Sequence, residues 1–234
     1  MQTVLFDTAD GSHTLYNDTL GVYYHSVHGA LQESVHIFIN LGLKAAIQQA
    51  TKEQKSQISI FEMGFGTGLN ALLTWIEADR HRFPIHHVTV EAYPAKSEQC
   101  QSLNYDNLLN FNGLHQIHQA EWGKPVVLSK YFTIEKHHTK LQDFETNHCF
   151  EAVYYDAFAP AAQPELWEQS IFEKIATWLH PTANLTTYCS KSYVRRNLEA
   201  AGFKVEKHPG PCRKREVIRA IYQAAPSTHS HPVP

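Results

Sequence analysis

Three glycines alternate at Gly64, Gly66 and Gly68, between an apolar run rich in β-branched residues and a helical pattern. Glycine lets the backbone turn sharply and come close to a ligand, because no Cβ atom stands in the way. The N–H groups at the start of the following helix are then free to face a bound group. The stretch predicts a strand, a tight turn and a helix, a unit that binds nucleotide-like ligands in many folds and is purely structural in others.

Three acidic residues, Glu62, Glu91 and Asp156, each stand at the carboxyl end of a predicted strand. In a parallel sheet these ends meet at one edge, where ligands bind. Glu91 follows Gly68 at the distance at which dinucleotide-binding folds place the carboxylate that accepts hydrogen bonds from ribose hydroxyls. A loop acid at position 91 and a turn-capping aspartate at position 156 are the structural alternatives.

The spacing of the glycines discriminates between ligands. It departs from the G-x-G-x-x-G pattern of dinucleotide sites, and the sequence contains no GxxxxGK[ST] phosphate loop. An acid beside the glycines would repel a pyrophosphate, whereas it favours a cation. A G-x-G-x-G loop with a preceding acid resembles the way in which class I methyltransferases receive S-adenosylmethionine, which is cationic and lacks phosphates.

A second motif, residues 156–160 (DAFAP), is similar in spacing to the D/N-P-P-Y/F motif of methyltransferases that act on amino groups. Such an amine must be neutral and must point its lone pair along the S–CH₃ axis. A carboxylate can accept its N–H groups and so fix that direction. Asp156 is therefore the catalytic candidate, and Phe158 could line the pocket or stack on a planar base.

Charge is distributed unevenly in a chain whose net charge is only −3. Between residues 190 and 222, nine basic residues stand against three acidic ones, and the rest of the chain is acidic. This pattern predicts a basic patch at one end of the protein. Such a patch either binds a polyanion or is simply a solvated face.

The sixteen histidines and four cysteines call for a test for metal sites. The sequence contains neither an HExxH motif nor a Cys-His cluster with zinc spacing, so no metal site is expected. The scattered cysteines indicate reduced thiols in a cytosol. No apolar run reaches the roughly 20 residues that cross a membrane, and the N-terminus lacks the layout of a signal peptide. These observations predict a cytoplasmic protein without a membrane segment.

Four motifs occur together in chain order. They are residues 61–70 (FEMGFGTGLN), residues 156–160 with 164–167 (DAFAP and PELW), residues 192–203 (SYVRRNLEAAGF) and residues 213–216 (RKRE). Together with an N-terminal segment from residue 24 to residue 38, they resemble the methyltransferase part of MnmC and its stand-alone form, MnmD. The resemblance covers about residues 15–222.

The resemblance implies a tRNA-modifying enzyme. Such an enzyme uses S-adenosylmethionine to methylate the aminomethyl group at C5 of the wobble uridine, which is often 2-thiolated, after other enzymes have installed that group. In the fused form, a flavin-dependent oxidase domain first removes a carboxymethyl group. The chain has no second dinucleotide motif, so methyl transfer alone is expected, by a monomer.

The same resemblance assigns residues to the ligands. S-adenosylmethionine would be held by Glu62, Gly64, Gly66, Thr67, Gly68, Asn70, Glu91 and Asp156. Lys140 stands where the family has an acid that meets the adenine amino group, and Asp143, three residues later, is the candidate for that contact.

The tRNA anticodon stem-loop would lie against the basic segment, because its phosphates need lysine and arginine. The candidates for these contacts are Arg195, Arg196, Arg213, Lys214 and Arg215. Tyr24 could stack on the splayed uridine, and a core or lid role fits this tyrosine equally well. Methylation of another amine, and a non-catalytic tRNA-binding module of the same fold, are the alternative functions.

Strands alternate with helices along the chain, which predicts an α/β fold. With the resemblance, it predicts a Rossmann-like class I methyltransferase with a mostly parallel, seven-stranded sheet. The expected parts are an N-terminal hairpin and helix extension (1–57), a methyltransferase domain (58–223) and a disordered tail (224–234). Helices are expected over residues 94–109 and 164–178, and residues 110–150 show no clear pattern.

Overall fold

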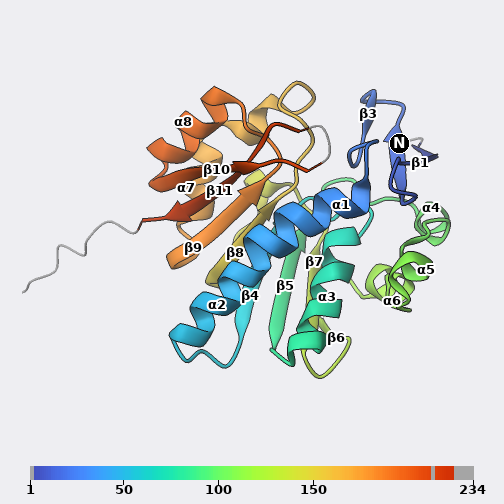
Figure 1. The fold of residues 1–234 in the computed structure, drawn as a ribbon, viewed down its shortest axis with the longest axis horizontal. Helices are drawn as coiled ribbons and strands as arrows, with labels where there is room; N and C mark the ends of the chain where they lie inside the picture. Colours follow the sequence, from blue (N-terminus) through green and yellow to red (C-terminus); the bar gives the residue numbers. More distant parts are fainter. Residues whose placement is uncertain (1–2, 212–213, 224–234) are drawn as a thin grey trace, which may run out of the picture.

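The structure, a computed structural model, describes residues 3–211 and 214–223 (Figure 1). Within them, eight strands form one sheet in the order β10-β11-β9-β8-β4-β5-β7-β6. In chain order these strands are β4 (Ile58–Met63), β5 (Ile85–Val90), β6 (Pro125–Val127), β7 (Phe132–His137), β8 (Phe150–Tyr155), β9 (Leu179–Thr187), β10 (Phe203–Pro209) and β11 (Glu216–Tyr222). The predicted tail, 224–234, and the candidate Arg213 lie outside the described residues.

The predicted α/β fold with a mostly parallel sheet is confirmed. Strands β7, β5, β4, β8 and β9 run parallel to one another, whereas β11 is antiparallel to both β9 and β10. The sheet has one strand more than predicted, because β6 pairs antiparallel with β7 at the edge. Its three residues begin with Pro125, so the sequence carries no strand pattern there.

Helices cover both faces of the sheet (Figure 1). One continuous helix, formed by α1 (Ala30–Ser34), the π-helical segment η1 (Val35–Leu43) and α2 (Lys44–Lys52), lies on one face beside α3 (Leu69–His81). The other face carries α7 (Gln169–Ala176) and α8 (Ser192–Ala200). Successive residues of a strand point to opposite faces, so Ile60 and Phe61 belong to different hydrophobic cores.

Two helices are shorter than predicted. The first, expected over residues 94–109, is divided into α4 (Ser97–Gln101) and α5 (Tyr105–Leu109). The second is a 3₁₀ turn, η3 (Pro164–Trp167), followed by α7, because Glu168 between them has an extended backbone with ψ of 155°. Residues 110–150 contain α6 (Leu114–Gln119), β6, β7 and a second 3₁₀ turn, η2 (Leu141–Asp143). In the described residues, no helix is both long and apolar enough to cross a membrane.

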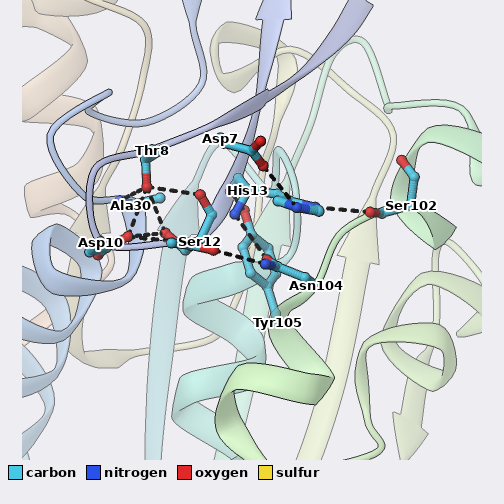
Figure 2. Close-up of polar contacts among 10 residues, drawn as sticks. Asp7, Thr8, Asp10, Ser12, His13, Ala30, Ser102, Asn104 and Tyr105 are labelled. Carbon is cyan, nitrogen blue, oxygen red and sulfur yellow. Dashed lines mark hydrogen bonds and ion pairs between the residues drawn. The ribbon is translucent and has the colours of Figure 1, made fainter.

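The N-terminal segment forms a small antiparallel sheet of β1 (Thr3–Asp7), β2 (His13–Asn17) and β3 (Val22–Tyr23), as the predicted hairpin requires. Figure 2 shows how the turn between β1 and β2 is held. Asp10 accepts hydrogen bonds from Thr8 and Ser12, and it also accepts one from the backbone N–H of Gln32, at 2.9 Å, in the first turn of α1. The turn thereby satisfies a free N–H group at the start of that helix.

The same sheet is also tied to the segment between α4 and α5 (Figure 2). Asn104 accepts a hydrogen bond from the backbone N–H of His13 at 2.9 Å, and the Tyr105 hydroxyl donates to the His13 carbonyl at 2.8 Å. These contacts join residues about 90 positions apart. These hydrogen bonds hold the small N-terminal sheet in place. The chain runs from this sheet to Tyr24, so they also help to position the Tyr24 side chain at the edge of the large sheet.

Candidate active site

A cavity of about 390 Å³ opens where β4, β5 and β8 end, at the carboxyl edge of the sheet. This volume lies in the range of small-molecule sites. Eight of the candidates from the sequence line it: Tyr24, Gly64, Gly66, Asn70, Glu91, Asp143, Asp156 and Phe158. Residues that are far apart in the chain therefore meet at the edge where the strand-end carboxylates were expected.

The first two glycines of the loop are needed at their positions. Gly64 has φ of +90°, and a Cβ atom there would lie 2.9 Å from the backbone oxygen of Asp156. Gly66 has φ of +52°, and a Cβ atom there would lie 3.2 Å from the Tyr24 ring. Side chains disfavour positive φ, and here the neighbouring atoms also leave no room. The loop passes tightly between the end of β8 and the N-terminal extension.

Glu91 follows β5 and is held by backbone N–H groups. Its Oε2 atom accepts a hydrogen bond from Gly66 at 3.0 Å, and Oε1 accepts one from Tyr93 at 2.9 Å. Burial raises the pKa of this carboxyl above its ordinary value, although both backbone hydrogen bonds oppose that change. Each oxygen keeps a second lone pair, so the fixed carboxylate can still accept hydrogen bonds from the hydroxyls of a ligand.

Asp156 follows β8 and has a different environment. Its backbone N–H donates to the Met63 carbonyl at 3.0 Å, and its Oδ2 atom accepts a hydrogen bond from the Asn70 amide at 2.9 Å. The surrounding protein replaces water and raises the pKa of Asp156 to about 7, with Glu62 adding to the increase and Asn70 opposing it. A carboxyl group with this pKa responds to small changes in nearby charge at neutral pH.

Glu62, predicted at the ligand, does not line the cavity. Its side chain is fully buried, and Oε2 accepts a hydrogen bond from Nε2 of His87 at 2.9 Å. Among the described residues, Glu62 Oε1 and Asn70 Oδ1 have no hydrogen-bond partner although both are buried. Buried acceptors are nearly always satisfied. Asn70 lines the cavity, so its Oδ1 atom is suited to a donor that a ligand brings, whereas Glu62 does not reach the cavity.

Thr67 and Gly68, also predicted at the ligand, shape the loop from behind. The Thr67 side chain is buried and its hydroxyl accepts a hydrogen bond from Tyr105 at 3.2 Å, while its carbonyl oxygen accepts one from Nε2 of His118 at 2.9 Å. Gly68 has φ of +78° directly before α3. Neither residue lines the cavity. The glycine motif therefore includes residues that shape the loop without facing the cavity.

Two aromatic rings close one side of the cavity. Tyr24 and Phe158 contact each other edge to face, with 5.0 Å between ring centroids. The Phe158 carbonyl accepts a hydrogen bond from the Trp167 indole at 2.9 Å, which fixes the loop after β8. Burial and the nearby Glu91 raise the pKa of Tyr24 to about 12. The tyrosine therefore keeps its proton and can donate a hydrogen bond.

Comparison with known proteins identifies the family. A family model described as S-adenosyl-L-methionine-dependent methyltransferase matches residues 107–223, half of the chain. The chain belongs to this family. Its members use the cofactor that the glycine spacing favoured.

Relatives of this methyltransferase are longer proteins. The tRNA 5-methylaminomethyl-2-thiouridine biosynthesis bifunctional protein MnmC of Cupriavidus necator is 31% identical over 90% of this chain and 34% of its own length. The MnmC protein of Leptospira interrogans is 30% identical over 85% of this chain and 32% of its own length. The chain thus spans about a third of the length of these relatives, in agreement with the expected resemblance.

Solved structures agree on the fold. MNMC2 from Aquifex aeolicus superposes with a TM-score of 0.75 and 24% identity, covering 96% of this chain and 71% of the other. Spermidine synthase from Thermotoga maritima reaches a TM-score of 0.52 with 10% identity, covering 96% and 72%. At these identities the likeness shows the fold of the methyltransferase and nothing finer.

Several residues of the cavity were not candidates. Tyr93 follows Glu91 in the same loop, Gln163 lies in the loop after β8, Glu165 lies in the turn η3 that ends this connection, and Lys140 precedes η2. Lys140 and Asp143 both line the cavity, so the basic residue shares this wall with the predicted acid. Tyr93, Gln163 and Glu165 could have been predicted, because ligands contact the loops that follow parallel strands. Lys140 could not be predicted in this way, because residues 138–149 show no clear helix or strand pattern.

The four basic candidates that the structure describes do not line the cavity, and they differ from one another. The ammonium group of Lys214 pairs with Glu33 and lies 4.4 Å from the centroid of the Tyr188 ring. Arg195, Arg196 and Arg215, by contrast, are in no ion pair within the part of the chain that the structure describes. The latter three can therefore meet phosphates without first breaking an internal contact.

Proposed function

We propose that the chain transfers a methyl group from S-adenosylmethionine to the aminomethyl group at C5 of a wobble (2-thio)uridine in tRNA. The observation that carries the proposal is the carboxylate of Asp156, held by Asn70 at the mouth of the methyltransferase cavity. It is supported by the MnmC relatives, which align with most of this chain and whose name specifies 5-methylaminomethyl-2-thiouridine biosynthesis.

The cofactor is proposed to occupy the side of the cavity formed by the ends of β4 and β5. Gly64 and Gly66 line this side of the cavity, and Glu91 accepts hydrogen bonds from the ribose hydroxyls of the cofactor. The unpartnered Oδ1 atom of Asn70, which lines the cavity, suits its ammonium group. When bound, S-adenosylmethionine supplies a methyl group on a positively charged sulfur. Asp143 and Lys140 are at the wall proposed for adenine.

Asp156 is proposed to position the amine. As a carboxylate it accepts N–H groups of the aminomethyl nitrogen, which directs the nitrogen lone pair at the methyl group. Asn70 holds the carboxylate through a hydrogen bond of 2.9 Å. The positive charge of the cofactor favours the ionised form of Asp156, whose pKa without the cofactor is about 7. Cofactor binding thus favours the ionised carboxylate of Asp156, which accepts the N–H groups of the amine.

The tRNA is proposed to reach the cavity from the side of β9 and α8. Tyr24 and Phe158 present aromatic surface to the splayed uridine, which proteins commonly hold by stacking. Arg195 and Arg196 lie on α8, which begins five residues after β9 ends at the same edge of the sheet as the cavity. Together with Arg215 they supply positive charge for the phosphates of the anticodon stem-loop.

The proposal also specifies where the reaction takes place and which enzymes act before it. A tRNA substrate puts the reaction in the cytoplasm, in keeping with the free thiols of Cys100, Cys149 and Cys189. The enzymes that install the aminomethyl group must act first, because this group is the methyl acceptor. We further propose that the protein acts as a monomer.

A nucleoside assay tests the proposal. The protein is incubated with S-adenosylmethionine and tRNA that carries 5-aminomethyl-2-thiouridine, and the digested nucleosides are analysed by mass spectrometry. We expect a mass gain of one methyl group on this nucleoside and none with the Asp156→Asn variant. Transfer to small amines with no transfer to tRNA would favour methylation of another amine. Binding of tRNA without any transfer, beside an active control enzyme, would favour a non-catalytic tRNA-binding module.

A further inference from the structure

Glu135 is surrounded by histidines on one face of the large sheet. Its carboxylate lies on β7, and His86 on the neighbouring strand β5 approaches Oε2 with Nε2 at 3.0 Å. His148, from the segment between η2 and β8, places Nε2 at 3.5 Å from the same oxygen. His137 on β7 donates a hydrogen bond to the other oxygen, Oε1, at 2.9 Å. One carboxylate therefore gathers three imidazoles from three parts of the chain.

The spacing of these donors suits a metal ion. In His86, Glu135 and His148, one ligand atom from each residue lies within 4.8 Å of the others. A tetrahedral ion with bonds of about 2.0 to 2.2 Å separates its ligand atoms by roughly 3.4 Å. The two distances to Oε2, 3.0 and 3.5 Å, are close to this value. An ion could enter with small side-chain adjustments and no movement of the strands.

The polar contacts of the cluster converge on one atom. Nε2 of His86 is buried and lies 3.0 Å from Oε2 of Glu135, the oxygen that Nε2 of His148 also approaches. The carboxylate of Glu135 gives the cluster a negative charge, which attracts a cation.

The surroundings resemble those of a structural site. His137 holds the second carboxylate oxygen, as residues around metal ligands commonly do. Aromatic side chains flank the cluster: Phe144 lies 4.9 Å from the His137 ring and Phe150 lies 6.2 Å from the His148 ring, measured between centroids. Two histidines and a carboxylate favour Zn²⁺ over Mg²⁺, which prefers oxygen ligands.

We propose that His86, Glu135 and His148 form a binding site for a divalent transition-metal ion, with Zn²⁺ as the probe. The ion fastens the segment 138–149 to the sheet, because His148 belongs to that segment and the other two ligands lie on β5 and β7. The segment contains Lys140 and Asp143, which line the cavity, so the ion steadies one cavity wall. The inference is independent of the proposed function.

Calorimetric titration with zinc chloride tests the site. We compare the unaltered protein with the variants His148→Ala and Glu135→Gln and with a matched control, His115→Ala, which removes an exposed histidine on α6. We expect one tight zinc ion per chain in the unaltered and control proteins, and affinity at least about 10-fold weaker in the other two. His229 and His231 are present in all four chains and contribute equally. Mg²⁺ is expected not to compete.

Two further measurements address the proposed role. Zinc at 100 times its dissociation constant should raise the Tm of the unaltered protein by roughly 5 °C or more. It should also slow amide hydrogen exchange in residues 138–149, and His148→Ala should abolish both effects. Equal zinc affinity in all four proteins, or no tight binding at all, would overturn the site. Tight binding without slower exchange in that segment would overturn the fastening role.

Discussion

Two carboxylates of the cavity, Glu91 and Asp156, follow strands β5 and β8 of the same sheet but are held in different ways. Both oxygens of Glu91 accept backbone N–H groups. Asp156 accepts one hydrogen bond from the side chain of Asn70, and its pKa is about 7. Backbone donors fix a carboxylate, whereas a single side-chain donor leaves lone pairs free for a substrate.

The difference suggests a division of labour. We propose that the half of the cavity at β4 and β5 holds the methyl donor in a preformed place, and that the half at β8 receives the acceptor amine. A preformed half contributes binding, and a half that takes part in the reaction contributes rate. Variants in the two halves should therefore affect different quantities, and the predictions below test this from the largest effect to the smallest.

The largest effect is expected from Gly64→Ala, because Gly64 lies where the two halves touch. The new Cβ atom would be 2.9 Å from the Asp156 carbonyl oxygen and φ is +90°. We expect a loss of about 2 to 4 kcal/mol in free energy of unfolding and no detectable methyl transfer. Gly123→Ala is the control, since φ there is +80° but no atom lies within 4 Å of its Cβ position. Equal losses in urea titrations of both variants would show that strain alone acts.

Asp156→Asn should reduce turnover while leaving cofactor affinity nearly unchanged. The amide cannot accept two N–H groups as a carboxylate can, so we expect kcat to fall by roughly 10² to 10⁴-fold. Steady-state kinetics give kcat, and calorimetry with S-adenosylmethionine gives the affinity, which we expect to change less than about 3-fold. Equal losses in both quantities would assign Asp156 to cofactor binding instead.

Glu91→Gln should show the opposite pattern. Removing the charge weakens hydrogen bonds to ribose hydroxyls, and a hydrogen bond to a charged group contributes about 1.5 to 3 kcal/mol. We expect cofactor affinity to fall by roughly 10 to 150-fold, measured by the same calorimetry. With saturating cofactor, kcat should recover to within a few-fold of the unaltered enzyme. A kcat that stays low at saturation would refute the division between the halves.

The raised pKa of Asp156 predicts a pH-dependent cost to stability. The pKa of Asp156 is 3.8 in the unfolded chain and about 7 in the folded protein. Between these two pH values, Asp156 is ionised in the unfolded chain but still protonated in the folded protein. The unaltered protein should therefore lose stability relative to Asp156→Asn as pH rises through this range. Urea titrations at about pH 5 and pH 8, without cofactor, compare the two proteins. A difference that is independent of pH would show that the folded pKa is not raised.

The smallest effect, and one outside the cavity, is expected at the basic surface. Replacing Arg195 and Arg196 with glutamine should lower the slope of log affinity for tRNA against log salt by about 2, one for each lost phosphate contact. Lys52→Gln is the control, because Lys52 is exposed and ends α2 near the start of β4, at the opposite edge of the sheet. Filter binding over a range of salt gives both slopes. An unchanged slope in the double variant would indicate that tRNA binds to another face of the protein.

Local sequence determined several features of this methyltransferase. Residues with β-branched and apolar side chains define β4, β5 and β8, and the alternating glycines require the turn before α3, because only glycine tolerates that backbone at Gly64. Since parallel strands end at one edge, the strand-end acids Glu91 and Asp156 could be placed in one cavity in advance. These conclusions depend on short-range periodicity and on the geometry of a single residue.

Tertiary structure decided the rest. Glu62, like Glu91, is a glutamate near the carboxyl end of a strand. It nevertheless pairs with His87 inside the protein, because helices cover the face of the sheet on which it lies. Likewise, Lys214 and Arg215 are neighbours in one basic run, but only Lys214 meets Glu33. The histidines around Glu135 have no spacing that marks a site, because β5, β7 and residue 148 meet only through pairing and packing. Partners that are distant in the chain leave no local pattern, so only the folded chain reveals them.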